Sequence, residues 1–269
     1  MDYKNLQIAV DGGVARLTLC RPDRLNSFTR PMLVELRQAL DWVDAQALRG
    51  SVRVLLLQAQ GRAFCAGQDL RELAVPAGTD ALTCPDLGAA MEQDYAPLIL
   101  RLQALRVPSV ARVQGVAAGA GVSLALACDL VLAAHGADFV LAFSQIGLVP
   151  DSGATWALPQ RLGLARALGL ALLSERMSAQ QAADWGLIWR AVDDADLVSA
   201  ADALARKLAA LPTLALLRTR QAMHAAARHT LEQQLALEAG LLRELGASAD
   251  YAEGVTAFLE KRTPQFVGA

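Results

Sequence analysis

Two stretches of small residues in this sequence could present backbone amides to a ligand. Residues 61–70, GRAFCAGQDL, and residues 115–123, GVAAGAGVS, each follow an apolar run and combine glycine with alanine. Small residues let the main chain approach a bound group closely, and the first amides of a helix are unpaired at the positive end of its dipole. Two amides aimed at one point would form an oxyanion hole, which stabilises the enolate of a thioester.

A third segment supplies a carboxylate. Asp151 lies in a Pro-Asp-Ser-Gly turn, a place that is also typical of an aspartate capping the helix expected after it. If Phe143, Val149 and Trp156 surround it, burial would raise its pKa, and it could take up a proton and return it elsewhere. The residues alone leave both roles open.

The composition excludes several classes of function. Hydrophobic residues make up 54% of the 269 residues and charged residues 19%, so the chain can bury a core. The net charge is −2 without a dense basic run, which predicts no nucleic-acid partner. Apolar stretches end well before the roughly 18 residues of a membrane-spanning helix, so no membrane partner is expected. The four cysteines form no CxxC pair, and no metal site is expected. Without a signal-peptide pattern, we expect a cytoplasmic protein.

Apolar periodicity indicates the elements that must position these residues. A hairpin is expected around residues 11–13, and a helix that begins near Thr29 and ends near Leu48. A nearly unbroken apolar run over residues 52–58 suits a buried parallel strand. Strands and helices then alternate, which predicts a mostly parallel sheet with right-handed crossovers. The further strands are expected over residues 108–113, 129–134 and 187–192, and the further helices over residues 89–105 and 119–127 and from about residue 177 to the end.

These stretches resemble the crotonase superfamily, also called the enoyl-CoA hydratase/isomerase family. The resemblance spans nearly the whole chain in the family's order, in residues 21–27, 63–70, 115–129, 146–150 and 258–266. It implies an α/β fold, a crotonase-like spiral of ββα units over residues 1–200 that holds an acyl-CoA site, and a helical C-terminal trimerisation region over residues 201–269. It further implies a homotrimer or dimer of trimers, and no cofactor beyond the coenzyme A that the substrate carries.

The resemblance also implies roles for single residues. The oxyanion donors would be the N–H groups of Gln68 and Ala120, and Asp151 would be the working carboxylate, as in members that shift double bonds or attack an aromatic ring. The two glutamates of enoyl-CoA hydratases fall on Ser123 and Phe143, which argues against hydration. The residues expected along the substrate, with the last two closing the site from this or a neighbouring subunit, are Arg24, Leu25, Ser27, Ala66, Gly67, Asp69, Leu70, Ala118, Gly119, Ser123, Phe143, Pro150, Trp156, Phe258 and Lys261.

The predicted activity is an acyl-CoA isomerase that shifts a double bond or rearranges a ring epoxide. Residues 143–156 look most like the ring-1,2-epoxyphenylacetyl-CoA isomerases of phenylacetate degradation (the PaaG type), which usually have glycine in place of Ala154. One alternative is an enoyl-CoA hydratase, thioesterase or dehalogenase of the same superfamily; another is a non-catalytic acyl-CoA-binding scaffold. Residues 75–88, rich in Pro, Gly, Thr and Asp, predict a mobile surface segment that helps to shape the acyl pocket.

Overall fold

The computed structural model describes residues 2–73 and 85–268. Its strands are β1 (Leu6–Asp11), β2 (Val14–Leu19), β3 (Val54–Ala59), β4 (Ser109–Val113), β5 (Val116–Ala118), β6 (Leu130–Ala134), β7 (Asp138–Val140), β8 (Arg176–Ser178) and β9 (Arg190–Val192). They form a six-stranded sheet in the order β1-β2-β3-β4-β6-β9 and a three-stranded sheet in the order β5-β7-β8. Most of the predicted segment 75–88 lies outside the described residues.

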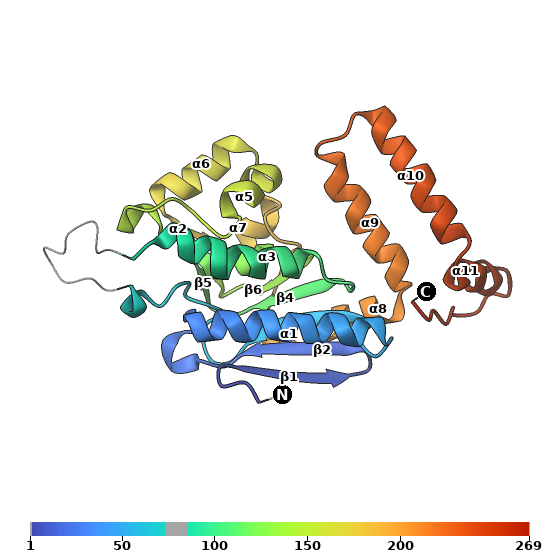
Figure 1. The fold of residues 1–269 in the computed structure, drawn as a ribbon, viewed down its shortest axis with the longest axis horizontal. Coiled ribbons are helices and arrows are strands. Elements are labelled where there is room, and N and C mark those ends of the chain that lie inside the picture. The colour runs from blue at the N-terminus through green and yellow to red at the C-terminus, as the bar shows by residue number, and fades with distance from the viewer. Residues whose placement is uncertain (1, 74–84, 269) are drawn as a thin grey trace, which may run out of the picture.

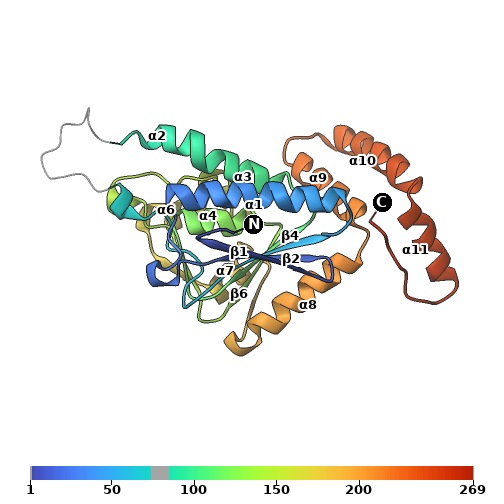
Figure 2. The same ribbon diagram turned by 60° about the horizontal axis from the view of Figure 1, so that its bottom comes forward.

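The large sheet confirms the predicted hairpin and the predicted parallel order. β1 and β2 pair antiparallel across Gly12 and Gly13, which both have positive φ, as a two-residue hairpin turn requires. From β2 to β9 every neighbouring pair is parallel. The first four residues of β3 are buried, because helices cover both faces of the sheet at this strand. Figure 2 shows α1 (Arg30–Leu48) and α3 (Ala96–Gln103) on one face and α8 (Leu197–Ala210) on the other.

The first helix begins where the sequence predicts. The Thr29 hydroxyl accepts a hydrogen bond from the Met32 amide at 3.4 Å, and proline stands in the first turn. The helix predicted over residues 89–105 runs from residue 87 to residue 103 as α2 (Leu87–Ala90), a π-helical turn (Met91–Tyr95) and α3. The sequence did not reveal the π-helical turn, which buries Asp94 and Tyr95.

The small sheet was not predicted. β5 leads directly into α4 (Ala120–Leu126), so the second small-residue stretch is a strand-to-helix turn, as expected. The first stretch, residues 61–70, is a loop that leads into a short 3-10 helix, Leu70–Glu72.

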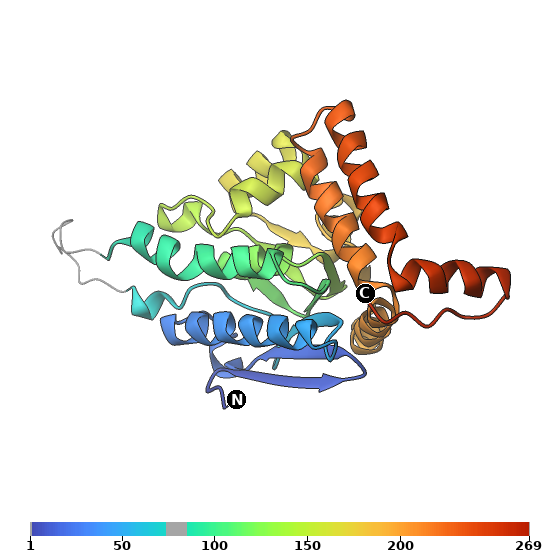
Figure 3. The same ribbon diagram turned by 45° about the vertical axis from the view of Figure 1, so that its right-hand side comes forward.

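The remaining helices are α5 (Ala154–Leu162), α6 (Leu164–Leu173), α7 (Ala179–Asp184), α9 (Thr213–Ala226), α10 (Leu231–Gly246) and α11 (Ala249–Leu259). The boundary expected at residue 200 falls inside α8, whose alanine-lined face packs on the large sheet, so the core continues to residue 210. Figures 1 and 3 show α9 to α11 projecting from one end of this core. Within the described ranges no helix combines the length and apolarity needed to cross a bilayer.

Two arginines form hydrogen bonds between the core and the region of the projecting helices. Arg220 of α9 donates to the Asp129 carboxylate at 3.1 Å. Arg53, which precedes β3, donates to the carbonyl oxygens of Leu211 at 2.7 Å and Phe266 at 2.6 Å. α10 has no buried residue. The trimerisation role expected for this region stays a prediction.

Candidate active site

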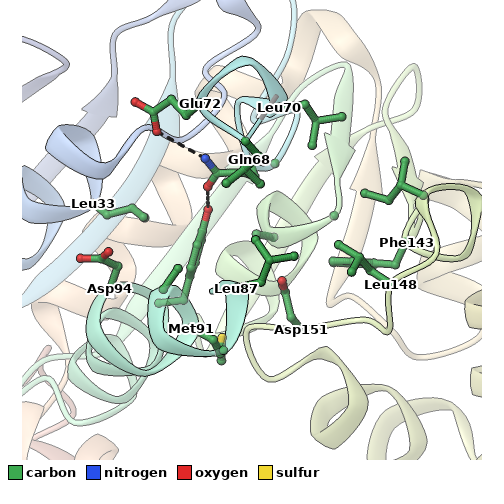
Figure 4. Close-up of a pocket in the computed structure, with 18 of the residues that line it drawn as sticks. Leu33, Gln68, Leu70, Glu72, Leu87, Met91, Asp94, Phe143, Leu148 and Asp151 are labelled. Carbon is green, nitrogen blue, oxygen red and sulfur yellow. Dashed lines mark hydrogen bonds between the residues drawn. The ribbon is translucent and has the colours of Figure 1, made fainter. Parts of the chain in front are cut away.

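A cavity of about 780 Å³ opens between α1, the α2–α3 helix, the β5–α4 turn and residues 142–151. This volume is in the range of small-molecule sites. Figure 4 shows Leu33 and Asp94 on one wall, Phe143 and Leu148 on the opposite wall, and Gln68 and Asp151 between them. The apolar side chains that line the cavity come from helices and loops on every side: Leu33, Leu70, Leu73, Leu87, Met91, Phe143, Ile146, Leu148 and Val149.

Two main-chain amides on the cavity wall are free to bind a ligand. Gln68 and Ala120 both line the cavity, and within residues 2–73 and 85–268 neither N–H has a hydrogen-bond partner. The amides of Asp69 and Gly119 beside them each donate to a main-chain carbonyl at 2.9 Å. Ala120 is the first residue of α4, so its N–H also lies at the positive end of that short helix.

Glycine at two positions allows the amide-bearing segments to meet. Gly67 has φ +82°, and a Cβ there would lie 2.8 Å from the Ala118 carbonyl oxygen and 3.4 Å from the Ala120 nitrogen. A Cβ on Gly121 would lie 2.4 Å from the Cys65 carbonyl oxygen. Side chains at these positions would therefore force the two segments apart.

Asp151 reaches the same cavity from the residues before α5. Its main-chain carbonyl accepts hydrogen bonds from the Ser123 hydroxyl at 3.0 Å and from the Ala154 amide at 2.9 Å. Its side chain does not cap α5, because the N-cap is Gly153 and no side-chain cap bond forms. The carboxylate instead points into the cavity in Figure 4. The capping role that the sequence left open is therefore excluded.

Burial raises the pKa of Asp151, and a hydrogen bond from the Ser152 hydroxyl at 3.0 Å opposes the shift. This confirms the expected direction. Among the described residues, no basic side chain pairs with Asp151. Asp94 in the same cavity differs, since Arg30 and Arg37 hold it at 3.2 and 3.3 Å. Asp151 is therefore a desolvated carboxylate that is suited to exchange protons.

Six of the fifteen expected substrate-binding residues line this cavity. Besides Gln68, Ala120 and Asp151, the lining includes the expected residues Ala66, Gly67, Leu70, Ala118, Gly119 and Phe143. Pro150 directly precedes Asp151 but is not part of the lining. Asp86, Leu87 and Gly88 also line the cavity, which places the end of the predicted 75–88 segment at its wall.

Two expected residues lie on the other side of the Asp151 main chain. Trp156 and Ser123 line a separate cavity of about 250 Å³ beside α3. Trp156, in the first turn of α5, lines this second cavity with Ile99 and Leu100 of α3 and is not part of the cavity that Asp151 lines. Ser123 supports the main chain of Asp151 and does not enter the substrate cavity.

Another group of expected residues lies outside the cavity of this chain. Asp69 is buried in ion pairs with Arg21 at 3.2 Å and Arg71 at 3.3 Å. Phe258 is 82% exposed at the end of α11, and Figures 1 and 2 place α11 at the opposite end of the molecule from α2. Besides Ser123, Pro150 and Trp156, the expected residues that lie outside the lining are Arg24, Leu25, Ser27, Asp69, Phe258 and Lys261.

Several cavity residues were missed from the sequence. Leu33, Met91 and Tyr95 belong to helical segments whose apolar periodicity predicts only a core-facing stripe. Tyr95 is the last residue of the π-helical turn and lines the cavity, and its hydroxyl donates a hydrogen bond to the Gln68 side-chain carbonyl. A tyrosine within an otherwise aliphatic stripe is the signal that could have indicated it.

Comparison with known proteins gives a consistent assignment. The sequence profile of the family described as "Enoyl-CoA hydratase/isomerase" matches residues 9–269. The chain is 51% identical to the 1,2-epoxyphenylacetyl-CoA isomerase of Escherichia coli K12, covering 96% of this chain and 97% of that protein. It is 36% identical to the 2,3-dehydroadipyl-CoA hydratase of the same organism, covering 95% of each chain.

Solved structures agree with this result. The crystal structure of an enoyl-CoA hydratase from Polaromonas sp. JS666 matches with a TM-score of 0.89 and 33% identity, covering 97% of this chain and 99% of that chain. The expected crotonase-like α/β fold, with its helical C-terminal region, is thus confirmed. The profile match and the relatives together show that this chain is an enzyme of the enoyl-CoA hydratase/isomerase family, the crotonase superfamily.

Proposed function

We propose that the enzyme isomerises an acyl-CoA thioester, with Asp151 as the single proton carrier and the amides of Gln68 and Ala120 as the oxyanion hole. The observation that carries this proposal is their arrangement. A desolvated carboxylate without a basic partner and two main-chain N–H groups without a hydrogen-bond acceptor, counted over residues 2–73 and 85–268, line one apolar cavity. Such donors stabilise the charge that develops on a thioester oxygen far more than they stabilise the uncharged carbonyl.

For a 3-enoyl-CoA, the proposed reaction is a proton shift between two carbons. Asp151 takes the proton from the carbon next to the carbonyl, and the electrons of the broken C–H bond form an enolate whose charge rests on the thioester oxygen. Return of the proton two carbons further along moves the double bond into conjugation with the carbonyl. One carboxylate is enough because the same group takes and returns the proton.

We infer that an epoxidised aromatic acyl-CoA belongs to the substrate class. The relative from Escherichia coli named 1,2-epoxyphenylacetyl-CoA isomerase supports this inference, since it is 51% identical over nearly the whole chain. Phe143, which is buried and lines the cavity, offers a flat apolar surface to a ring. In this reaction the carbon–carbon bond of the epoxide breaks while Asp151 transfers a proton, and the seven-membered oxepin that forms has the same mass as the epoxide.

Hydration fits the site less well, although several relatives are named as hydratases, one of them 44% identical to this chain. The Ser123 hydroxyl is bonded to the Asp151 carbonyl, and Phe143 has no group that could activate water. Another carboxylate that lines the cavity, Glu72, accepts hydrogen bonds from the Arg30 amide at 3.1 Å and the Gln68 side chain at 3.4 Å. Glu72 is therefore engaged in holding the cavity wall.

The test is turnover of the purified enzyme on a 3-enoyl-CoA, a 2-enoyl-CoA and enzymatically prepared ring-epoxyphenylacetyl-CoA, followed by ultraviolet absorption and mass. A product of unchanged mass from the first or third substrate is expected, with no added cofactor because coenzyme A arrives with the substrate. Addition of water to the 2-enoyl-CoA as the dominant reaction would refute the proposal. Tight acyl-CoA binding without turnover would instead favour a scaffold.

We also propose that α9 to α11 assemble the enzyme into a homotrimer or a dimer of trimers. Large apolar side chains are exposed along this region at Leu231, Leu235, Leu242 and Phe258. In such an assembly Phe258 and Lys261 would reach the cavity of a neighbouring subunit. Light scattering on the purified protein measures the assembly, and a monomer at micromolar concentration would contradict it.

The pH dependence of activity should report on Asp151. The carboxylate is the form that removes the proton, so kcat/KM should fall as the pH drops through its pKa. Because burial raises that pKa, the acid limb should lie above the range of an ordinary aspartate, about pH 3.9. Ser152→Gly removes the hydrogen bond that lowers the pKa and suits φ +52° at this position, so the limb should move to higher pH.

A matched control for this experiment is Ser174→Gly. Ser174 also has positive φ, at +54°, but its hydroxyl bonds to the Leu141 carbonyl and not to a carboxylate. The acid limb of the kcat/KM profile of Ser174→Gly should coincide with that of the unmodified enzyme. If the acid limb of Ser152→Gly lies at the same pH as that of the unmodified enzyme, a group other than Asp151 determines it.

A further inference from the structure

The side chain of Gln68 is held at both of its polar atoms. Its carbonyl oxygen accepts a hydrogen bond from the Tyr95 hydroxyl, and its NH2 group donates to the Glu72 carboxylate at 3.4 Å, the dashed line between the labelled residues Gln68 and Glu72 in Figure 4. Glu72 in turn accepts a hydrogen bond from the Arg30 amide at 3.1 Å. A chain of hydrogen bonds thus crosses the cavity wall from the π-helical turn to the start of α1.

Tyr95 itself has little freedom to move. It is 7% exposed, and its ring meets the edge of Phe28 at a centroid distance of 6.1 Å and an interplanar angle of 73°. Arg30 and Arg37 fix Asp94, the preceding residue, on the same turn. Burial, and then the nearby charge of Asp151, raise the pKa of the Tyr95 hydroxyl, so it stays protonated and remains a donor.

An untethered Gln68 side chain would interfere with the oxyanion site. Its carbonyl oxygen is an acceptor attached to the residue whose own N–H must bind the substrate, and it lies in the same cavity as the free Ala120 amide. Such an acceptor competes with the thioester oxygen for both amides. The carboxylate of Asp151 could also attract the Gln68 NH2 group into the space that the substrate needs.

We propose that Tyr95 is a positioning residue for the oxyanion site: by holding the Gln68 side chain against Glu72, it keeps the Gln68 main-chain N–H directed at the thioester oxygen and free of an internal competitor. This inference rests on the proposed function of the two amides. The inference concerns only how the Gln68 main-chain N–H is kept free to bind the substrate. Tyr95 acts through Gln68, and it is not assigned a step in proton transfer.

The experiment uses Tyr95→Phe in the full-length enzyme, which keeps the ring and removes only the donor. We expect kcat to fall about tenfold or more, a part of the hundredfold or greater loss that removal of an oxyanion donor causes, while KM changes by less than about threefold. The second readout needs no turnover. A chromophoric acyl-CoA, 4-(dimethylamino)cinnamoyl-CoA, absorbs at longer wavelength when its carbonyl is polarised, and this red shift should be smaller in the variant.

A double-mutant cycle separates positioning from a direct role. Gln68→Ala removes the competing side chain and retains the main-chain N–H, so adding Tyr95→Phe to it should change kcat by less than about twofold. An equal loss in both backgrounds would overturn the proposal, as would a wild-type red shift in Tyr95→Phe. Absence of any red shift in the unmodified enzyme would instead contradict the oxyanion hole itself. Asp193→Asn, at a side chain that is 83% exposed and lies outside the cavity and outside α9 to α11, is the control and should change neither readout.

Discussion

Replacing Asp151 with asparagine should lower kcat by about a thousandfold, within the range that general acid–base groups contribute. Asparagine keeps the size and polarity of the side chain but cannot accept the proton from the carbon next to the carbonyl. No other carboxylate in the described cavity is both unpaired and desolvated, so no group is ready to replace it. Single-turnover kinetics with a 3-enoyl-CoA would measure the loss in the chemical step.

Binding should survive this substitution. The amides of Gln68 and Ala120 and the apolar walls are untouched, so the affinity for an unreactive saturated acyl-CoA, measured by calorimetry, should change by less than about threefold. Asp193→Asn is the matched control, because that side chain is 83% exposed and lies outside the cavity, and its turnover should equal that of the unmodified enzyme. A Asp151 variant with normal turnover would exclude this residue as the proton carrier.

The direction in which Asp151→Asn changes the stability of the protein follows from the shifted pKa of Asp151. The folded state raises the pKa of Asp151, so it binds the proton more readily than the unfolded chain. The free energy of unfolding must therefore decrease as the pH rises from the unfolded pKa to the folded pKa, and stay reduced above it. Removing the charge should leave the unfolding temperature at neutral pH unchanged or higher. A lower value would mean that the carboxylate supports the fold.

The sequence was most informative where local rules and burial agree. The capping hydroxyl of Thr29 and the proline after it fixed the start of α1. The unbroken apolar run at β3 indicated a parallel strand covered on both faces. The small-residue stretches around Gly67 and Gly119 indicated close main-chain approach, and both segments do line the cavity with Asp151. These features depend on residues that are close in sequence, so they can be predicted from a single sequence.

Features that depend on tertiary packing were not accessible in the same way. β5, β7 and β8 have three residues each, too few for an alternating pattern to show. The π-helical turn changes the face that Tyr95 presents, and a period of 3.6 residues cannot anticipate that change. Trp156 was placed beside Asp151 because the two are close in sequence. The start of α5 between them directs the tryptophan to α3.

Substitution of Gly67 should have a large effect on activity, because the two segments that carry the Gln68 and Ala120 amides approach each other closely at this residue. In Gly67→Ala, the new Cβ would stand 2.8 Å from the Ala118 carbonyl oxygen, and the backbone would have to keep φ +82°, which alanine rarely adopts. Both conflicts fall on the peptide that carries the Gln68 N–H. We expect kcat to drop about a hundredfold, as for the loss of one oxyanion donor, and the free energy of unfolding to fall by about 1–3 kcal/mol.

The control for Gly67 must be a glycine that has room for a methyl group. Gly169 in α6 has ordinary helical φ, and no atom lies within 4 Å of the position of its Cβ. Gly169→Ala should therefore keep full activity and gain up to about 1 kcal/mol, because alanine loses less entropy in a helix. Chemical unfolding and turnover measured on both variants separate the loss of stability from the loss of kcat. If Gly67→Ala loses stability but not kcat, the amide-bearing segments are held together for the fold alone and the thioester oxygen is bound elsewhere.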